Sequence, residues 1–173
     1  MTRGGFRLGT TGAIVLALVA LPPRATCGQG VELVADINTA GGAGYSPSPA
    51  NLAAVGSTIL FIQDDGEHGR ELWRSDGTTA GTVLVKDVRP GVESAFATGS
   101  GSLVPAGSRA FFVADDGVHG AELWVSDGSE AGTWLVTDLT PGAAGTTPQW
   151  LTSAGTRAFF TSYAGNGQYD LWV

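Results

Sequence analysis

The sequence predicts an all-β fold, a β-propeller-like array of about three four-stranded antiparallel sheets that could form an incomplete ring. First, residues 60–88 return fifty-one residues later as residues 111–139, and the two copies are identical at 18 of 29 positions. Second, the chain holds 27 glycines, which predicts many turns. Third, no stretch after residue 28 shows helical periodicity, and β-branched and aromatic residues cluster in short runs between glycine-rich breaks.

The first 28 residues are typical of a secretory signal peptide. A basic stretch, MTRGGFRLGTTG, precedes an apolar run of nine residues, AIVLALVAL, and a tail of small residues broken by prolines. The apolar run is too short for an ordinary transmembrane helix. We therefore expect cleavage near Cys27 or Gly28 and a secreted, extracellular or cell-surface protein. The alternative is a buried N-terminal helix.

Cys27 is the only cysteine, so an intramolecular disulfide is impossible and packing alone must hold the fold together. It could instead carry the lipid anchor of a bacterial lipoprotein. Small apolar residues usually precede the cysteine of such a site, and the segment from Arg24 to Thr26 fits that pattern badly. We expect Cys27 to leave with the signal peptide.

Residues 31–173 are expected to form the repeat domain, with units at approximately 33–83, 84–134 and 135–173. The third unit is a weaker and shorter copy. Phe159-Phe160 corresponds to Phe111-Phe112, and the segment Asp170–Trp172 corresponds to Glu122–Trp124.

Each unit is expected to contain four short strands. In the middle unit these are residues 102–106, 109–114, 121–126 and 133–139, with Asp-Gly pairs at 116–117 and 127–128 marking tight connections. Several strands are apolar at consecutive positions, which indicates that both faces are covered. A propeller blade meets that demand, and a stacked all-β array is the nearest rival.

The segment 31–37 has the sequence type that ends each unit, as at 84–88 and 135–139. If it pairs beside Leu171–Val173, three complete four-stranded units result and the ring closes within one chain. The alternative is an open array, or a fragment of a longer one, whose exposed sheet edge favours self-association.

The segments Glu71–Thr78 and Glu122–Ser129 resemble the ELWxxDGT repeat family of secreted bacterial proteins, also described as hyalin-like. The flanking L-V-x-D, P-G and F-F-x-A-D-D-G segments fit the same pattern. The resemblance covers nearly all of the chain after residue 28. It implies an exported repeat protein and implies no enzymatic activity. The chain departs from the pattern at Ser129, at Asp170, and after Val173, where S-D-G-T should follow.

Charge limits the partners. After residue 28 the chain has six basic and sixteen acidic side chains, a formal charge of −10. Such a surface repels phosphate backbones and anionic lipid, so nucleic acid is excluded as a partner. No stretch after residue 28 is long and apolar enough for a membrane span, so none is expected. Cations, an extracellular protein or a glycan are the partners that remain.

Two kinds of acidic loop are candidate metal sites. One is an Asp-Asp pair followed by a histidine, which offers oxygen and imidazole ligands, and the other is the S-D-G segment, which could help bind calcium. The candidates are Asp64, Asp65, His68, Asp76, Asp115, Asp116, His119 and Asp127. The same residues also suit turns, in which aspartate accepts backbone N–H bonds. No cofactor other than calcium is expected.

Glu71 and Glu122 lie near aspartates, as the paired carboxylates of a glycosidase do, but they recur in each unit and so suggest a structural role. Trp73, Trp124 and Trp172 also recur and are expected to pack between sheets. Trp134 and Trp150 break the repeat and are better candidates for surface contacts. No catalytic motif is present, so no enzyme is expected.

The expected function is a secreted, non-enzymatic interaction or structural module. One alternative is a calcium-assisted carbohydrate- or protein-binding propeller. Another is a truncated hydrolase-like propeller.

Overall fold

The computed structural model describes residues 32–37, 49–97 and 101–173. All of its strands lie in one compact unit, Leu33–Val173. The expected signal peptide, residues 1–28, lies outside the described residues, and so does Cys27. The described residues contain no helix, and so none with the length and hydropathy needed to cross a bilayer.

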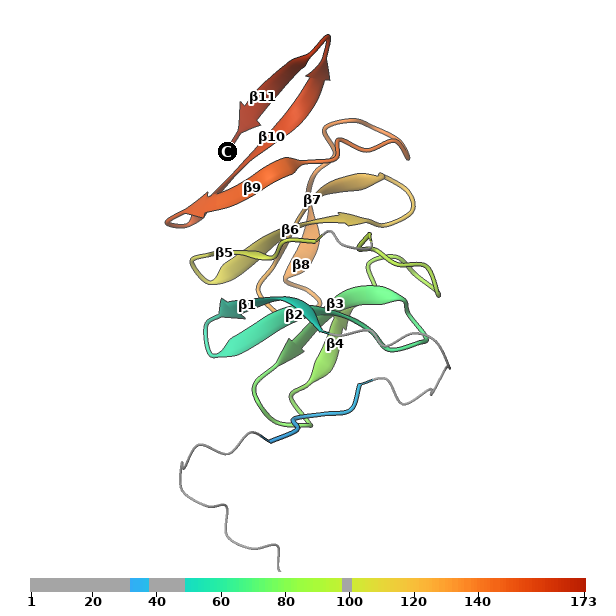
Figure 1. Ribbon diagram of the computed structural model, residues 1–173, viewed down its shortest axis with the longest axis vertical. Helices are drawn as coiled ribbons and strands as arrows, with labels where there is room; N and C mark the ends of the chain where they lie inside the picture. Colours follow the sequence, from blue (N-terminus) through green and yellow to red (C-terminus); the bar gives the residue numbers. More distant parts are fainter. Residues whose placement is uncertain (1–31, 38–48, 98–100) are drawn as a thin grey trace, which may run out of the picture. The chain divides into compact units, whose positions relative to one another are not determined.

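In the described ranges, eleven strands form three antiparallel sheets of four, four and three strands, none of them closed (Figure 1). Within each sheet, strands that are consecutive in sequence pair with one another, so each sheet is a simple meander. The all-β prediction is confirmed, and the middle sheet matches the four strands expected for it. The strands are β1 (Ala50–Val55), β2 (Thr58–Asp64), β3 (Arg70–Ser75), β4 (Val83–Lys86), β5 (Val104–Ala106), β6 (Arg109–Asp115), β7 (Ala121–Ser126), β8 (Thr133–Thr137), β9 (Gln149–Ala154), β10 (Arg157–Gly165) and β11 (Gln168–Trp172).

The Asp-Gly pairs lie at the predicted hairpin connections. Gly117, between β6 and β7, has a φ of 81°, and Gly128, between β7 and β8, has a φ of 89°. Only glycine adopts this region at little cost, because it lacks a Cβ atom. The repeated glycines therefore set where each strand ends.

The core is continuous across the first two sheets. Its buried cluster contains Leu60 and Leu72 from the first sheet together with Phe112 and Trp124 from the second. Phe96, from the linker between the sheets, joins it with its ring centroid 5.5 Å from that of Phe112. After its first residue β7 is buried at every position, which confirms for this strand that both faces are covered.

The recurring tryptophans differ in burial. Trp73 and Trp124 are buried, as predicted. Trp172 is exposed, so the expectation of packing between sheets is wrong for this copy. It stacks on Phe160 at 6.3 Å between ring centroids and donates from Nε1 to Ser162 Oγ at 2.9 Å.

The third sheet is the most exposed of the three. Every residue of β11 is exposed, whereas β10 buries Ala158 and Phe160. Strands with few buried contacts open at low free energy. Amide protons of β11 are therefore expected to exchange roughly a hundredfold faster than those of β3 or β7. Hydrogen exchange followed by NMR measures this, and equal protection in all three sheets would contradict it.

Residues 32–37 do not form the closing strand. They have no regular secondary structure, and β11 pairs only with β10, so of the two alternatives the pairing beside Leu171–Val173 does not occur for the described part of that segment. Instead the Thr79 hydroxyl donates to the Val34 carbonyl at 2.7 Å, which places this segment near the β3–β4 turn.

Candidate functional site

The loop between β2 and β3 is organised by its aspartates. Asp64 Oδ1 accepts the Gly66 amide at 2.8 Å. Asp65 Oδ1 accepts the amides of Glu67 and His68 at 2.9 Å, and Asp65 Oδ2 lies 2.7 Å from His68 Nδ1. Asp64 Oδ1 and both carboxylate oxygens of Asp65 thus bond to groups of their own loop, as in an Asx turn.

The loop between β6 and β7 repeats this arrangement. Asp116 Oδ1 accepts the amides of Val118 and His119, and its Oδ2 lies 2.7 Å from His119 Nδ1. Burial alone would raise the pKa of Asp116, but the hydrogen bonds from His119 and Val118 outweigh it and lower the pKa overall. The side-chain hydrogen bond that Asp116 accepts from His119 raises the pKa of His119.

In the S-D-G turns between the third and fourth strands of the first two sheets, the aspartate likewise accepts hydrogen bonds from its own turn. Asp127 Oδ1 accepts the Ser129 amide at 2.9 Å and the Ser129 hydroxyl at 2.7 Å, and Asp76 accepts the same two bonds from Thr78. The bond from the Ser129 hydroxyl is the main cause of a lowered pKa at Asp127. Gly132 faces this carboxylate so closely that a Cβ atom there would overlap it.

Gly132→Ala is therefore expected to displace Asp127 and lower the free energy of unfolding by about 1 kcal/mol through the lost turn bonds. The double variant Asp127→Ala/Gly132→Ala should be no less stable than Asp127→Ala alone, because the clash is then gone. Urea unfolding of the three variants measures both values. Additive losses would contradict the explanation.

The eight candidate metal ligands fall into four separate loops. Within the described ranges, no group of three or more His, Cys, Asp or Glu side chains is placed to hold a metal ion. The metal and calcium assignments stay predictions, and the turn bonds above account for the same residues. In the third sheet the β10–β11 connection contains neither acid nor histidine.

Glu71 holds the linker that leaves its sheet. It lies on β3 and is fully buried. Its Oε2 accepts the Val88 amide at 2.9 Å, and its Oε1 accepts the amides of Arg89 and Ala95 at 3.3 and 3.2 Å. Burial raises the pKa of Glu71 to about 7, against the lowering effect of the three N–H donors. The carboxylate stabilises a loop and has no open face for a substrate.

Glu122 binds the linker between β8 and β9 in the same manner, with fewer hydrogen bonds. Its Oε1 accepts the Thr146 amide and hydroxyl, both at 2.7 Å. Its Oε2 is buried and has no hydrogen-bond partner among the described residues. Asp170, at the corresponding position of β11, is exposed. The structural role inferred from repetition therefore fits the first two sheets.

Arg89 connects the first two sheets and was not singled out by sequence reasoning. Its guanidinium Nη1 donates to Asp115 Oδ2 at 3.0 Å, and both side chains are partly exposed. The Asp115 amide also donates to the Ala95 carbonyl at 3.0 Å. Position 140, which corresponds to Arg89 in the next unit, is threonine, so this ion pair is not repeated.

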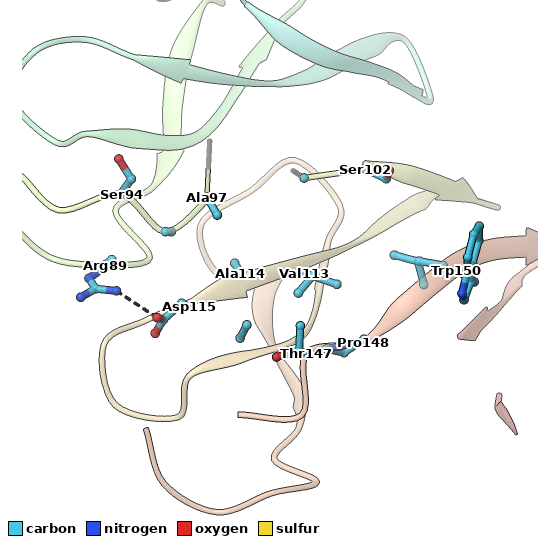
Figure 2. A pocket seen from close by; sticks show the side chains of 14 residues that line it. Arg89, Ser94, Ala97, Ser102, Val113, Ala114, Asp115, Thr147, Pro148 and Trp150 are labelled. Carbon is cyan, nitrogen blue, oxygen red and sulfur yellow. Dashed lines mark hydrogen bonds and ion pairs between the residues drawn. The ribbon is translucent and has the colours of Figure 1, made fainter. Parts of the chain in front are cut away.

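A cleft of about 480 Å³ opens beside this ion pair (Figure 2). Its lining includes Val113 and Ala114 of β6, with the Arg89–Asp115 pair toward one end and Trp150 toward the other (Figure 2). Hydroxyl-bearing residues and small apolar residues complete it: Ser94, Ala95, Ala97, Gly101, Ser102, Ala121, Thr147, Pro148 and Leu151.

Trp150 is in an unusual conformation. It is 82% exposed and has a φ of 55°. It sits at an irregularity in the β9–β10 pairing, and Asn51 occupies the corresponding irregularity of the first sheet with a φ of 54°. Asparagine tolerates this region, whereas a bulky side chain there is strained by about 1–3 kcal/mol. Strained residues of this kind cluster at ligand sites.

Trp150 was singled out from the sequence because it breaks the repeat, and the structure places it on the cleft. Trp134, the other tryptophan singled out, lies elsewhere on β8, 5.0 Å from the Arg109 guanidinium. No protein-family model, curated protein or solved structure matches this chain.

Proposed function

We propose that this chain is an exported, non-enzymatic repeat protein whose sheets are blades of a propeller-like array. It acts as an extracellular or cell-surface interaction and structural module. The observation that supports this most strongly is that the repeated polar side chains form hydrogen bonds within the fold. The repeated aspartates, the histidines and the two buried glutamates are all bonded within the fold.

A hydrolytic role fits these contacts poorly. A pair of catalytic carboxylates must flank one substrate bond, about 5 to 10 Å apart. Glu71 and Glu122 are fully buried, on strands of different sheets, and each accepts bonds from its own linker. The cleft beside Trp150 is, in contrast, accessible, and two of its lining residues, Arg89 and Trp150, have no identical counterpart in the other units. An interaction role uses that cleft and leaves the repeated residues to stabilise the array.

The test combines binding with product analysis. The exported protein is immobilised and exposed to a panel of extracellular polysaccharides, peptides and proteins, and binding is followed by interferometry. The recovered panel is then analysed by mass spectrometry. Reversible binding that is weakened by Trp150→Asn, with every panel member recovered intact, is the expected result. Consumption of a panel member that is lost in Glu71→Gln would overturn the proposal.

A second candidate is a calcium-assisted carbohydrate- or protein-binding propeller. It is favoured by the exposed carboxylates of Asp76 and Asp127, whose pKa values are lowered mainly by hydroxyl bonds from Thr78 and Ser129. Under the first proposal the melting temperature does not change with calcium. A calcium-dependent rise that disappears in Asp76→Ala/Asp127→Ala would favour the second candidate instead.

A further inference from the structure

We infer that the cleft beside Trp150 binds a short neutral saccharide, with the indole stacking on a sugar ring and the Arg89–Asp115 pair binding its hydroxyl groups. This rests on the proposed function and names its ligand class. The aromatic side chain, the fixed polar pair and the charge of the cleft each support it.

The aromatic contribution comes from Trp150. Its side chain lines the cleft and remains almost entirely accessible. The C–H faces of a pyranose ring are apolar and slightly positive, and they pack well on the negative face of an indole. Asn51 and Ser102 occupy the corresponding positions in the other units, so the fold itself does not require an aromatic residue there. The tryptophan is thus available for a ligand.

The polar contribution comes from the ion pair at the other part of the cleft. Asp115 Oδ1 accepts the Gly117 amide at 2.7 Å and its Oδ2 accepts from Arg89, so the carboxylate is held in one orientation. A guanidinium has five N–H donors, and Nη1 supplies the one side-chain bond that Arg89 makes within the described residues. A fixed donor group beside a fixed acceptor matches neighbouring sugar hydroxyls, each of which donates and accepts.

Size and charge define the ligand further. A volume of about 480 Å³ lies within the usual range of ligand pockets, about 300–1,000 Å³. The charges of Arg89 and Asp115 cancel each other, while the whole chain carries −7. A uronic-acid or sulfated chain would meet a repulsive field, so a neutral saccharide is favoured.

The experiment is isothermal titration of the exported protein with neutral hexasaccharides of glucose, xylose, mannose and N-acetylglucosamine, and with hexamers of hyaluronan and heparin. At least one neutral hexasaccharide should bind. Trp150→Asn should weaken its affinity at least tenfold, and Arg89→Gln should weaken it severalfold. Trp150→Asn installs the residue found at position 51, so its melting temperature should be at least that of the wild type. Trp134→Ala removes a tryptophan away from the cleft and should leave affinity unchanged.

Other outcomes separate the two proposals. Binding of no saccharide, tighter binding of the anionic hexamers, or neutral binding that survives Trp150→Asn would overturn the saccharide inference. If a peptide from the interaction panel binds at the cleft instead, the interaction proposal stands and the saccharide inference fails. If a saccharide is cleaved by the wild type, the non-enzymatic proposal fails.

Discussion

Replacing Glu71 by alanine is expected to lower the free energy of unfolding by about 3 kcal/mol or more, because three backbone N–H groups lose their acceptor in a buried position. Those groups belong to Val88, Arg89 and Ala95, in the linker that leads from the first sheet to the second. Urea unfolding followed by tryptophan fluorescence measures the loss. The linker, rather than a strand, should be the first part of the molecule to become accessible to proteases.

The chain offers a graded series of controls for this effect. Glu122→Ala removes the acceptor of one backbone amide and one hydroxyl, and should lower stability by about 1–2 kcal/mol. Asp170→Ala, at the corresponding exposed position of the third sheet, should change stability by less than about 0.5 kcal/mol. Equal losses in the three variants would contradict the assignment of the glutamates to the linkers.

The second large effect is a dependence of stability on pH. Burial raises the pKa of Glu71 from 4.5 to about 7 in the folded state. The folded protein therefore retains a proton that the unfolded chain releases above pH 4.5. This contribution to stability is complete below pH 4.5 and is lost as the pH rises to about 7, by up to about 3 kcal/mol. The pKa values of His68 and His119 are also raised in the folded state, so their contributions to stability are likewise lost as the pH rises, at pH values above 6.5.

Carbon-13 labelling of the glutamate carboxyls separates Glu71 from the histidines. Its carboxyl resonance should titrate with a midpoint near 7. In Glu71→Gln the decline in unfolding free energy between pH 4.5 and 7 should be much shallower, although the variant is less stable because an amide N–H₂ now faces a backbone donor. A Glu71 midpoint at or below 4.5 would show that the three N–H donors outweigh burial.

The strands and turns could be predicted because their determinants are local. Runs such as Phe111 to Val113 favour extended backbone, and the Asp-Gly pairs at Gly117 and Gly128 favour reversals. Pairing between consecutive strands followed from the repeat. The exposed state of Trp172 could not be predicted from its equivalence to Trp73 and Trp124, since burial depends on what packs against each copy.

The roles of Glu71 and Arg89 depend on residues distant in sequence. The amides that bond Glu71 lie 17 to 24 residues downstream, in a linker whose conformation no local pattern gives. The Arg89–Asp115 pair joins two repeat units. The similarity between residues 33–37 and 84–88 left a closing strand and an open array as alternatives, because it indicates that the segment can form a strand but not which strand it pairs with.

The repeated glutamates Glu71 and Glu122 each bind, by hydrogen bonds, the linker that follows their own sheet. Amide hydrogen exchange at Val88, Ala95 and Thr146 tests this most directly, because these amides lie outside the strands and bond to Glu71 or Glu122. These amides are expected to exchange as slowly as the paired amides of β3 and β7, and Val88 and Ala95 are expected to become unprotected in Glu71→Ala. Rapid exchange of all three in the wild type would contradict it.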